Sequence, residues 1–192
     1  MIKNWKKDIL TIPNLLSLFR LVLIPVYVVI YLNATEMRDY FIAAGILAIS
    51  CLTDLVDGKI ARKFNMISTV GKILDPLADK ATQFTLIICL SVRHPVLWNL
   101  VLLFVIKESF QLIAGLATLR KGRMLTGALM TGKICTTILF VSLTLMILLP
   151  ELSKSAVNVI TVVDAVFMLI AFADYIHAYF GHGNQVQDLE QN

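Results

Sequence analysis

The sequence predicts an all-α, polytopic integral membrane protein with six transmembrane helices, preceded by a short interfacial amphipathic helix. Three observations support this prediction. Hydrophobic residues make up 58% of the 192 residues, and the mean hydropathy is +0.80. Only 16% of the residues are charged, whereas a soluble domain carries roughly a quarter. Apolar stretches of about 20 residues, long enough to cross a bilayer, recur along the whole chain.

The first ten residues have the pattern of a helix that lies in the headgroup layer. Ile2, Trp5 and Ile9 recur at helical spacing, whereas the lysines between them take the other face. A frayed basic start is the alternative. The apolar stretch that follows lacks a small-residue cleavage pattern, so we expect it to stay in the mature protein.

Six apolar stretches are expected to form the membrane spans. They cover residues 13–32, 39–60, 73–92, 96–119, 128–149 and 156–180. No segment long enough for a soluble domain remains, and neither a repeat nor a Gly/Ser linker is visible. Residues 1–180 are therefore expected to form a single membrane domain, and the polar residues 181–192 a disordered tail.

The distribution of lysine and arginine predicts the orientation. Alternate connections carry most of the cations, and the opposite side has only Arg38, Arg93 and Lys154. Because cytoplasmic loops are enriched in Lys and Arg, both termini and the cation-rich connections are expected on the cytoplasmic side of the cell membrane. The net charge of +4 follows from this asymmetry, and no pattern indicates nucleic-acid binding.

Four aspartates, Asp54, Asp57, Asp75 and Asp79, lie within 26 residues of this apolar chain. The members of each pair are three or four residues apart, so each pair projects from one face of its helix. Carboxylates removed from water need a counter-charge. Hard cations such as Mg²⁺ or Mn²⁺ take oxygen ligands and leave positions for phosphate oxygens. The cluster therefore predicts a divalent-metal site at the cytoplasmic membrane edge.

Small residues accompany the aspartates. Gly58 and Ala61 follow Asp57, and Gly71 precedes Asp75. Glycine and alanine let a ligand approach the backbone closely, although ordinary helix packing is the alternative for each of them. Together with the carboxylates, they predict a pocket for a nucleotide or a sugar.

The complete pattern, D-x-x-D-G-x-x-A-R, eight residues, then G-x-x-x-D-x-x-x-D, resembles the signature of the CDP-alcohol phosphatidyltransferases. Its fixed positions are Asp54, Asp57, Gly58, Ala61, Arg62, Gly71, Asp75 and Asp79. Members of that family transfer the phosphatidyl group of a CDP-linked lipid to an alcohol and release CMP. The resemblance extends to the six-helix layout. It implies a transferase of phospholipid biosynthesis that uses CDP-diacylglycerol and two divalent cations, Mg²⁺ or Mn²⁺.

The resemblance also implies roles for individual residues. Asp54, Asp57 and Asp75 would ligate the metal, and Asp79 would join them and act as the base that takes the proton from the acceptor hydroxyl. The implied CDP-binding set is Asn14, Asp54, Gly58, Ala61, Arg62 and Gly71. Arg20 lies deep in the first span, where we expect it to contact the nucleotide or a phosphate directly. The alternative is that it snorkels to the interface or pairs with a carboxylate such as Asp57.

Residues 12–20, 75–80 and 132–137 are most similar to the bacterial phosphatidylglycerophosphate synthases, which implies glycerol 3-phosphate as acceptor and a homodimer. An acceptor with its own phosphate needs a second cationic site, and Arg120, Arg123 and Lys133 are the candidates. For the loop cations Arg120 and Arg123, a simple orientation signal is the alternative.

Lys107-Glu108 stands where these synthases carry Arg-Glu. Lys107 can still pair with Glu108, so helix packing is expected to survive the change. The difference also keeps open cardiolipin synthase, which uses phosphatidylglycerol as acceptor, as the runner-up. A divalent-cation transporter is the alternative from another class, but its acids would be spread along a route through the bilayer.

The last span carries further polar residues. Tyr175, Tyr179 and Phe180 are expected to form an interfacial aromatic belt. Asp174 and His177 are three residues apart and can meet on one helix face. Asp164 is a lone acid with no assigned partner.

Overall fold

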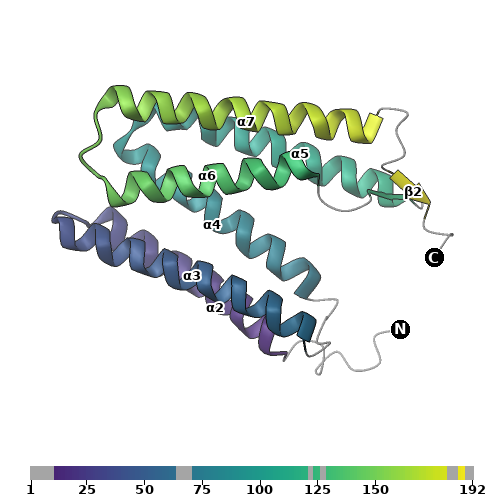
Figure 1. Cartoon of the computed structure of the whole chain (residues 1–192), viewed down its shortest axis with the longest axis horizontal. Coiled ribbons are helices and arrows are strands. Elements are labelled where there is room, and N and C mark those ends of the chain that lie inside the picture. Colours follow the sequence, from purple (N-terminus) through teal and green to yellow (C-terminus); the bar gives the residue numbers. More distant parts are fainter. Residues whose placement is uncertain (1–10, 64–70, 121–122, 126–128, 181–185, 189–192) are drawn as a thin grey trace. The chain divides into compact units, whose positions relative to one another are not determined.

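The computed structural model describes residues 11–63, 71–120, 123–125, 129–180 and 186–188, and Figure 1 shows the chain. The predicted amphipathic helix and its lysines lie outside these residues. The described part is helical apart from two three-residue strands. The elements are α2 Ile12–Leu32, α3 Met37–Lys63, α4 Gly71–Arg93, the 3-10 helix η1 Pro95–Leu97, α5 Trp98–Arg120, β1 Arg123–Leu125, α6 Met130–Leu148, α7 Lys154–Phe180 and β2 Val186–Asp188.

Each of the six predicted spans coincides with one α-helix. Four of these helical segments are long and apolar enough to cross a membrane: Pro13–Leu32, Pro95–Arg120, Met130–Leu148 and Lys154–Phe180. Only 22–33% of the most apolar part of each is buried, so most of its side chains face outward, as expected for a helix whose solvent is lipid. These four helices are consistent with a multi-pass membrane protein. The two helices that carry the aspartates, α3 and α4, are not among the four, and six spans stay a prediction.

Local sequence explains where the helices begin. Pro13 occupies the first turn of α2, where its missing N–H costs nothing, and Thr11 precedes it with extended dihedrals. The side chain of Asp39 accepts the backbone N–H groups of Thr35 and Glu36, at 3.0 and 3.2 Å, at the start of α3. Ser153 accepts the backbone N–H of Ala156 at 3.2 Å and caps α7.

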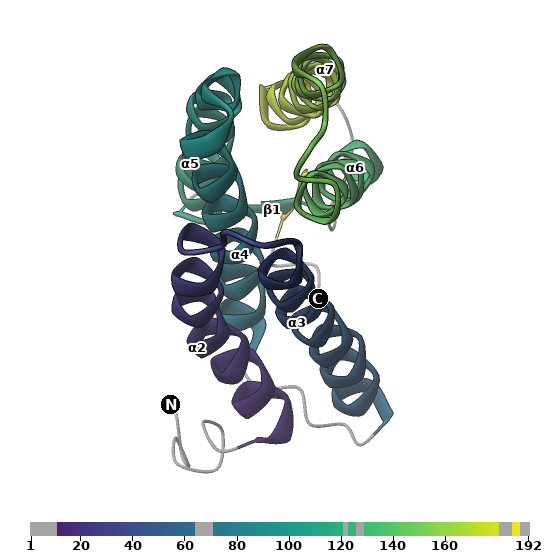
Figure 2. The same ribbon diagram turned by 90° about the vertical axis from the view of Figure 1, so that its left-hand side faces the viewer.

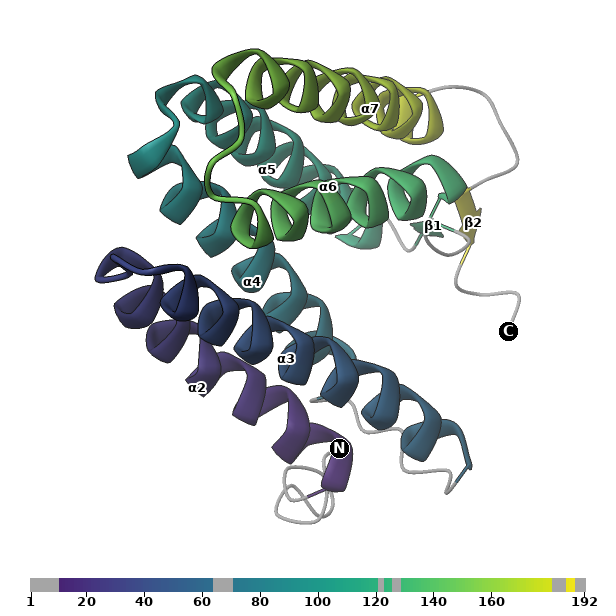
Figure 3. The same ribbon diagram turned by 60° about the vertical axis from the view of Figure 1, so that its left-hand side comes forward.

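The chain divides into two compact units, of which the first comprises Met1–Leu90 and Thr144–Glu151. Its main contact is between α2 and α3, which lie side by side in Figures 2 and 3. Tyr27 stacks on Tyr31 with ring centroids 5.6 Å apart, and Tyr31 meets Tyr40 edge-on at 6.0 Å. Ala43 is fully buried on α3, so a small side chain lets the two backbones approach closely.

The second unit comprises Ser91–Leu143 and Leu152–Asn192. Helices α5 and α7 pack against each other, and Phe110 of α5 meets Phe172 of α7 edge-on at 5.2 Å. Within the predicted tail, Val186–Asp188 forms strand β2 and pairs antiparallel with β1, with Arg123 opposite Asp188. No strand was predicted in this polar segment, because three residues carry too short a pattern to detect.

Gly132 of α6 creates the space that Tyr175 of α7 occupies. A Cβ atom at Gly132 would lie 2.7 Å from the Tyr175 hydroxyl oxygen and 3.0 Å from Cε2. Tyr175 is only 4% exposed, and its hydroxyl interacts with the backbone of Leu129 and the side chain of Gln111. The tyrosine is therefore a packed residue of the second unit. Its burial does not fit the interfacial aromatic belt that the sequence predicted for Tyr175.

We expect Gly132→Ala to destabilise the protein by about 1–3 kcal/mol, the usual cost of forcing an extra carbon into a packed interior. The matched control is Gly45→Ala on α3, where an added Cβ would meet nothing within 4 Å. Thermal unfolding of both variants in detergent measures the difference. Equal melting temperatures for the two variants would contradict the packing role of Gly132.

Candidate active site

One face of α2 is polar near its start, although the helix as a whole is apolar. Asn14, Ser17 and Arg20 are three residues apart and are 4%, 0% and 2% exposed. Residues at this spacing share one side of a helix. Leu15, Leu18 and other apolar residues of the same segment are exposed instead. This face of α2 therefore turns its polar side chains into the first unit.

Arg20 binds two of the predicted aspartates. Its Nη1 donates to Asp54 Oδ1 of α3 at 2.5 Å and to Asp79 Oδ1 of α4 at 2.6 Å. Ser17 Oγ donates to Asp75 Oδ1 on α4. The structure thus brings Asp54, Asp75 and Asp79 to the same polar face of α2. A carboxylate partner such as Asp57 was one of the alternatives that the sequence left open for Arg20, beside a direct nucleotide or phosphate contact. The side chain of Asp57 lies outside the described part.

The side chains of this cluster differ strongly in solvent exposure. The Arg20 side chain is 3% exposed, whereas those of Asp54 and Asp79 are 42% and 48% exposed. A buried guanidinium requires a partner, and two carboxylates so close to each other require a cation. Arg20 meets both needs from the buried side. The exposed carboxylate edges remain accessible to a ligand.

The donor chemistry of this cluster suits a hard divalent cation, because Asp54, Asp75 and Asp79 offer only carboxylate oxygens and no soft ligand. Within the described residues, however, no three Asp, Glu, His or Cys side chains are grouped as a ready ion site. The Arg20 guanidinium stands between Asp54 and Asp79. The carboxylate oxygens suit the predicted metal. In the described residues they contact Arg20 and Ser17 and are not arranged around an ion position.

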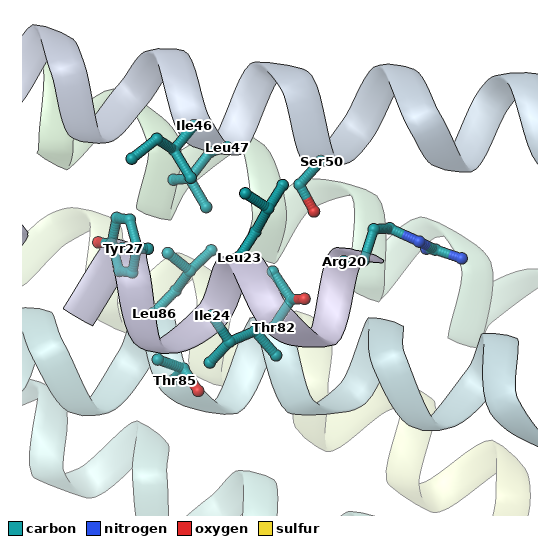
Figure 4. A pocket seen from close by; sticks show the side chains of 10 residues that line it. All are labelled: Arg20, Leu23, Ile24, Tyr27, Ile46, Leu47, Ser50, Thr82, Thr85 and Leu86. Carbon is teal, nitrogen blue, oxygen red and sulfur yellow. The ribbon is translucent and has the colours of Figure 1, made fainter. Parts of the chain in front are cut away.

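A crevice runs along α2 from Arg20 to Tyr27, between α3 and α4 (Figure 4). It is lined mainly by aliphatic side chains, with the hydroxyl-bearing Ser50, Thr82 and Thr85 among them. Its free volume is about 10 Å³, which corresponds to about one water molecule. The crevice is therefore a packing seam behind the aspartates and is too small for a nucleotide or a lipid chain.

The remaining predicted CDP-binding residues lie near the same helix ends. Gly71 is the first residue of α4 and is buried, and Asn14 is buried on α2. Gly58, Ala61 and Arg62 belong to the last turns of α3, and their side chains lie outside the described part. Their roles, like that of Asp57, stay predictions.

The predicted acceptor residues all belong to the second unit. Arg120 is exposed at the end of α5, and the backbone of Arg123 begins strand β1. Lys133 is exposed on α6, and its carbonyl accepts the hydroxyl groups of Thr136 and Thr137, each at 2.9 Å. Arg120 therefore lies at the end of α5 and Lys133 near the start of α6, whereas Arg123 begins β1. Their role in binding the acceptor phosphate stays a prediction.

Lys107 and Glu108 form the predicted ion pair, with 2.6 Å between Lys107 Nζ and Glu108 Oε1. The Lys107 side chain is 3% exposed, and its ammonium lies 5.9 Å from the centre of the Tyr175 ring. Lys107 thus combines an ion pair with a cation–π contact inside the second unit. Lys107 therefore keeps its ion pair with Glu108 where the similar synthases carry arginine.

Two acids of α7 have partners that the sequence did not identify. Asp174 accepts the hydroxyl of Thr131 on α6 at 2.5 Å, while His177 is exposed. Asp164 is 2% exposed and accepts the hydroxyl of Ser142 on α6 at 2.6 Å. Both contacts join α6 to α7 and have a structural role.

Sequence reasoning missed Ser17 as a partner of the aspartate cluster. The available signal was the three-residue spacing of Asn14, Ser17 and Arg20 within an apolar span, which places all three on one face. That spacing predicts a polar face but does not identify what the face contacts.

Comparison with known proteins identifies several relatives of this chain. A 32% identical relative from Aquifex aeolicus, named CDP-diacylglycerol–glycerol-3-phosphate 3-phosphatidyltransferase, aligns over 86% of this chain and 94% of its own length. A probable phosphatidylglycerophosphate synthase from Mycobacterium tuberculosis is 30% identical over 88% of this chain and 81% of the relative. A cardiolipin synthase (CMP-forming)/mitochondrial hydrolase fusion protein from Schizosaccharomyces pombe is 45% identical over 91 residues, which are 46% of this chain but only 14% of the fusion protein.

The family model for CDP-alcohol phosphatidyltransferases matches residues 10–174, which include the polar face of α2, the full aspartate motif and most of each compact unit. The transferases of this family generally depend on a divalent metal. On this evidence, the chain belongs to the CDP-alcohol phosphatidyltransferase family.

Proposed function

We propose that the protein transfers the phosphatidyl group of CDP-diacylglycerol to glycerol 3-phosphate, producing phosphatidylglycerophosphate and CMP for phospholipid biosynthesis. The main support for this proposal is the nearly full-length match to the Aquifex aeolicus relative, whose name describes this reaction. The aspartate cluster supports it, because carboxylates held together at one helix face suit metal-assisted phosphate chemistry.

Cardiolipin synthesis, with phosphatidylglycerol as the acceptor, is the second candidate. The observation in its favour is the 45% identity to the Schizosaccharomyces pombe fusion protein, which is higher than the identity to the two synthases but limited to 91 residues. The two reactions share CDP-diacylglycerol and CMP and differ only in the acceptor. The acceptor is therefore the property to measure.

In the proposed enzyme, Asp54, Asp57, Asp75 and Asp79 hold Mg²⁺ or Mn²⁺, which when bound neutralises the diphosphate and stabilises the departing CMP. Asn14, Asp54, Gly58, Ala61, Arg62 and Gly71 form the proposed CDP-binding set. Arg20 supports this arrangement by holding Asp54 and Asp79 from the buried side, 2.5 and 2.6 Å away.

Asp79 is the proposed general base. Its side chain is 48% exposed, so one carboxylate edge is open to an acceptor hydroxyl while Oδ1 is held by Arg20. Arg120, Arg123 and Lys133 are the proposed ligands of the acceptor phosphate. Arg120 and Lys133 are exposed, which suits contact with a polar substrate.

We also propose that the active site and both termini face the cytoplasm and that the protein is a homodimer in the cell membrane. The orientation is supported by the excess of Lys and Arg in the connections that share a side with the aspartates. The homodimer rests on the family resemblance. Large apolar side chains exposed along α2, α5, α6 and α7 offer surface for lipid and for a second copy alike.

The purified protein should release CMP from CDP-diacylglycerol and Mg²⁺ with glycerol 3-phosphate as acceptor. The assay compares glycerol 3-phosphate, phosphatidylglycerol, serine, inositol and inositol phosphate, with chelated metal as the blank. CMP release with phosphatidylglycerol alone would replace the main proposal by cardiolipin synthesis. Absence of CMP with every acceptor, together with Mg²⁺ flux into proteoliposomes, would favour the transporter alternative.

Asp79→Asn should lower CMP release by about 100-fold or more, because general bases typically contribute that much to a rate. Mn²⁺ binding, followed by electron paramagnetic resonance, should change far less, because Asp54, Asp57 and Asp75 remain. Glu151→Gln, an exposed acid-to-amide change, is the matched control. Wild-type turnover by Asp79→Asn would exclude this residue as the base.

Arg20→Gln should make the stability of the fold depend more strongly on divalent metal. Without the guanidinium, Asp54 and Asp79 repel each other. Because these carboxylates are 42% and 48% exposed, solvent screens part of the repulsion, and the cost is below that of breaking a fully buried pair. We expect Mg²⁺ to raise the melting temperature of Arg20→Gln more than that of the wild type. Arg38→Gln, at an exposed arginine of α3, serves as the control. The same Mg²⁺ effect in all three proteins would show that the metal and Arg20 do not act on the same carboxylates.

A further inference from the structure

The second unit contains a basic cavity that the proposed reaction does not use. Its free volume is about 270 Å³, and it is lined by Arg93, His94, Pro95, Val96, Lys154, Val157 and Asn158. Sequence analysis assigned only three cations, Arg38, Arg93 and Lys154, to the non-cytoplasmic side of the membrane. Two of these three line this one cavity, although they are distant in the sequence. Lys and Arg are uncommon in non-cytoplasmic loops, so the presence of two of them in one cavity requires an explanation.

The chain positions these cations through three helix ends. Arg93 ends α4, His94 precedes the 3-10 helix η1, and Lys154 begins α7. Helix η1 contacts α7, and Leu97 and Val157 are buried at 0% and 2% exposure, which gives this end of the unit an apolar base. The backbone N–H of Leu97 donates to the His94 carbonyl at 3.0 Å. The cationic side chains are thus attached to packed segments.

The electrostatics of the cavity favour an anion. Its described lining includes two formal cations and no acidic side chain. The first turn of α7 contains no acid either, so the positive end of the helix dipole adds to the charge of Lys154. Burial, followed by the neighbouring Arg93, lowers the pKa of His94 and so favours its neutral form. Arginine, lysine, histidine and asparagine together present several N–H donors, a set that suits phosphate oxygens.

The position of the cavity in the chain places it at the boundary between lipid and water. It lies where the candidate spans Pro95–Arg120 and Lys154–Phe180 begin. Trp98 follows η1 directly and is 51% exposed, as expected for an aromatic anchor at the headgroup level. At this depth, phosphate groups belong mainly to lipid headgroups.

We propose that Arg93 and Lys154, with His94 and Asn158, bind the phosphate group of an anionic lipid headgroup on the non-cytoplasmic side. Inorganic phosphate presents the same oxygens, so the experiment must separate these two sources. The predicted orientation determines only which leaflet supplies the lipid. The site and its test are independent of the acceptor used in the transfer reaction.

The first test counts bound lipids by native mass spectrometry of the full-length protein released from nanodiscs of phosphatidylcholine with phosphatidic acid. Phosphatidic acid is chosen because it is neither of the candidate acceptors. Each basic side chain near an anionic headgroup contributes about a factor of five, so Arg93→Gln combined with Lys154→Gln should weaken retention roughly 30-fold. Arg38→Gln removes the remaining cation of that side and should retain the lipid. Equal retention by the double variant and the wild type would overturn the proposal.

The second test measures the wild-type cavity and uses a variant only to assign one signal. The three histidines are labelled with ¹³C, and the His94 signal is assigned by its loss in His94→Gln. A bound phosphate group favours the protonated imidazole, so the pKa of His94 should rise in phosphatidic acid nanodiscs relative to phosphatidylcholine alone. A rise only with inorganic phosphate would overturn the assignment to lipid, and no rise with either would overturn the site. CMP release, measured in parallel, should be unchanged in the double variant.

Discussion

The contact on which the first unit depends is that of Arg20 with Asp54 and Asp79. A guanidinium that is 3% exposed has lost its water and must be compensated within the protein. Its two partners come from α3 and α4, so the same charge ties α2 to both helices that carry the aspartate motif. Ser17 adds a contact to Asp75 from the same face of α2. The polar face of one helix therefore determines how carboxylates from two others are held together.

This arrangement explains how the aspartates can be held close together and still be accessible to a ligand. Three carboxylates without a counter-charge would repel one another, and a protein cation on their exposed side would occupy the position that a metal ion needs. Arg20 instead compensates them from the buried side, and Asp54 and Asp79 keep 42% and 48% of their side-chain surface exposed. The crevice behind them has room for only about one water molecule. This crevice is therefore too small to admit a ligand to the carboxylates, whereas their exposed edges are available to one.

The helices and the site motif could be predicted because both depend on patterns within short stretches of sequence. Long apolar runs predicted the six α-helices of the described residues, and the four-residue spacing of Asp75 and Asp79 predicted that both lie on one face of α4. Partners on other helices could not be predicted, because a periodic pattern identifies a face and not what covers it. Ser17, the Asp164–Ser142 contact and the strand pair with Arg123 opposite Asp188 are of this kind. The burial of Tyr175 could not be predicted, because the space that Gly132 leaves for it exists only when α6 and α7 are paired.

The second unit uses polar contacts to fix how its helices are rotated. Interhelical hydrogen bonds in membranes contribute on average only about 0.6 kcal/mol each, so the Asp174–Thr131 contact adds little stability. It does, however, direct Thr131 toward α7, and the close approach of Tyr175 does the same for Gly132. Because successive helix residues are rotated by about 100°, Lys133 is turned away from that contact and is exposed. The direction of the proposed acceptor ligand is therefore determined by its two neighbours, which have no charge of their own.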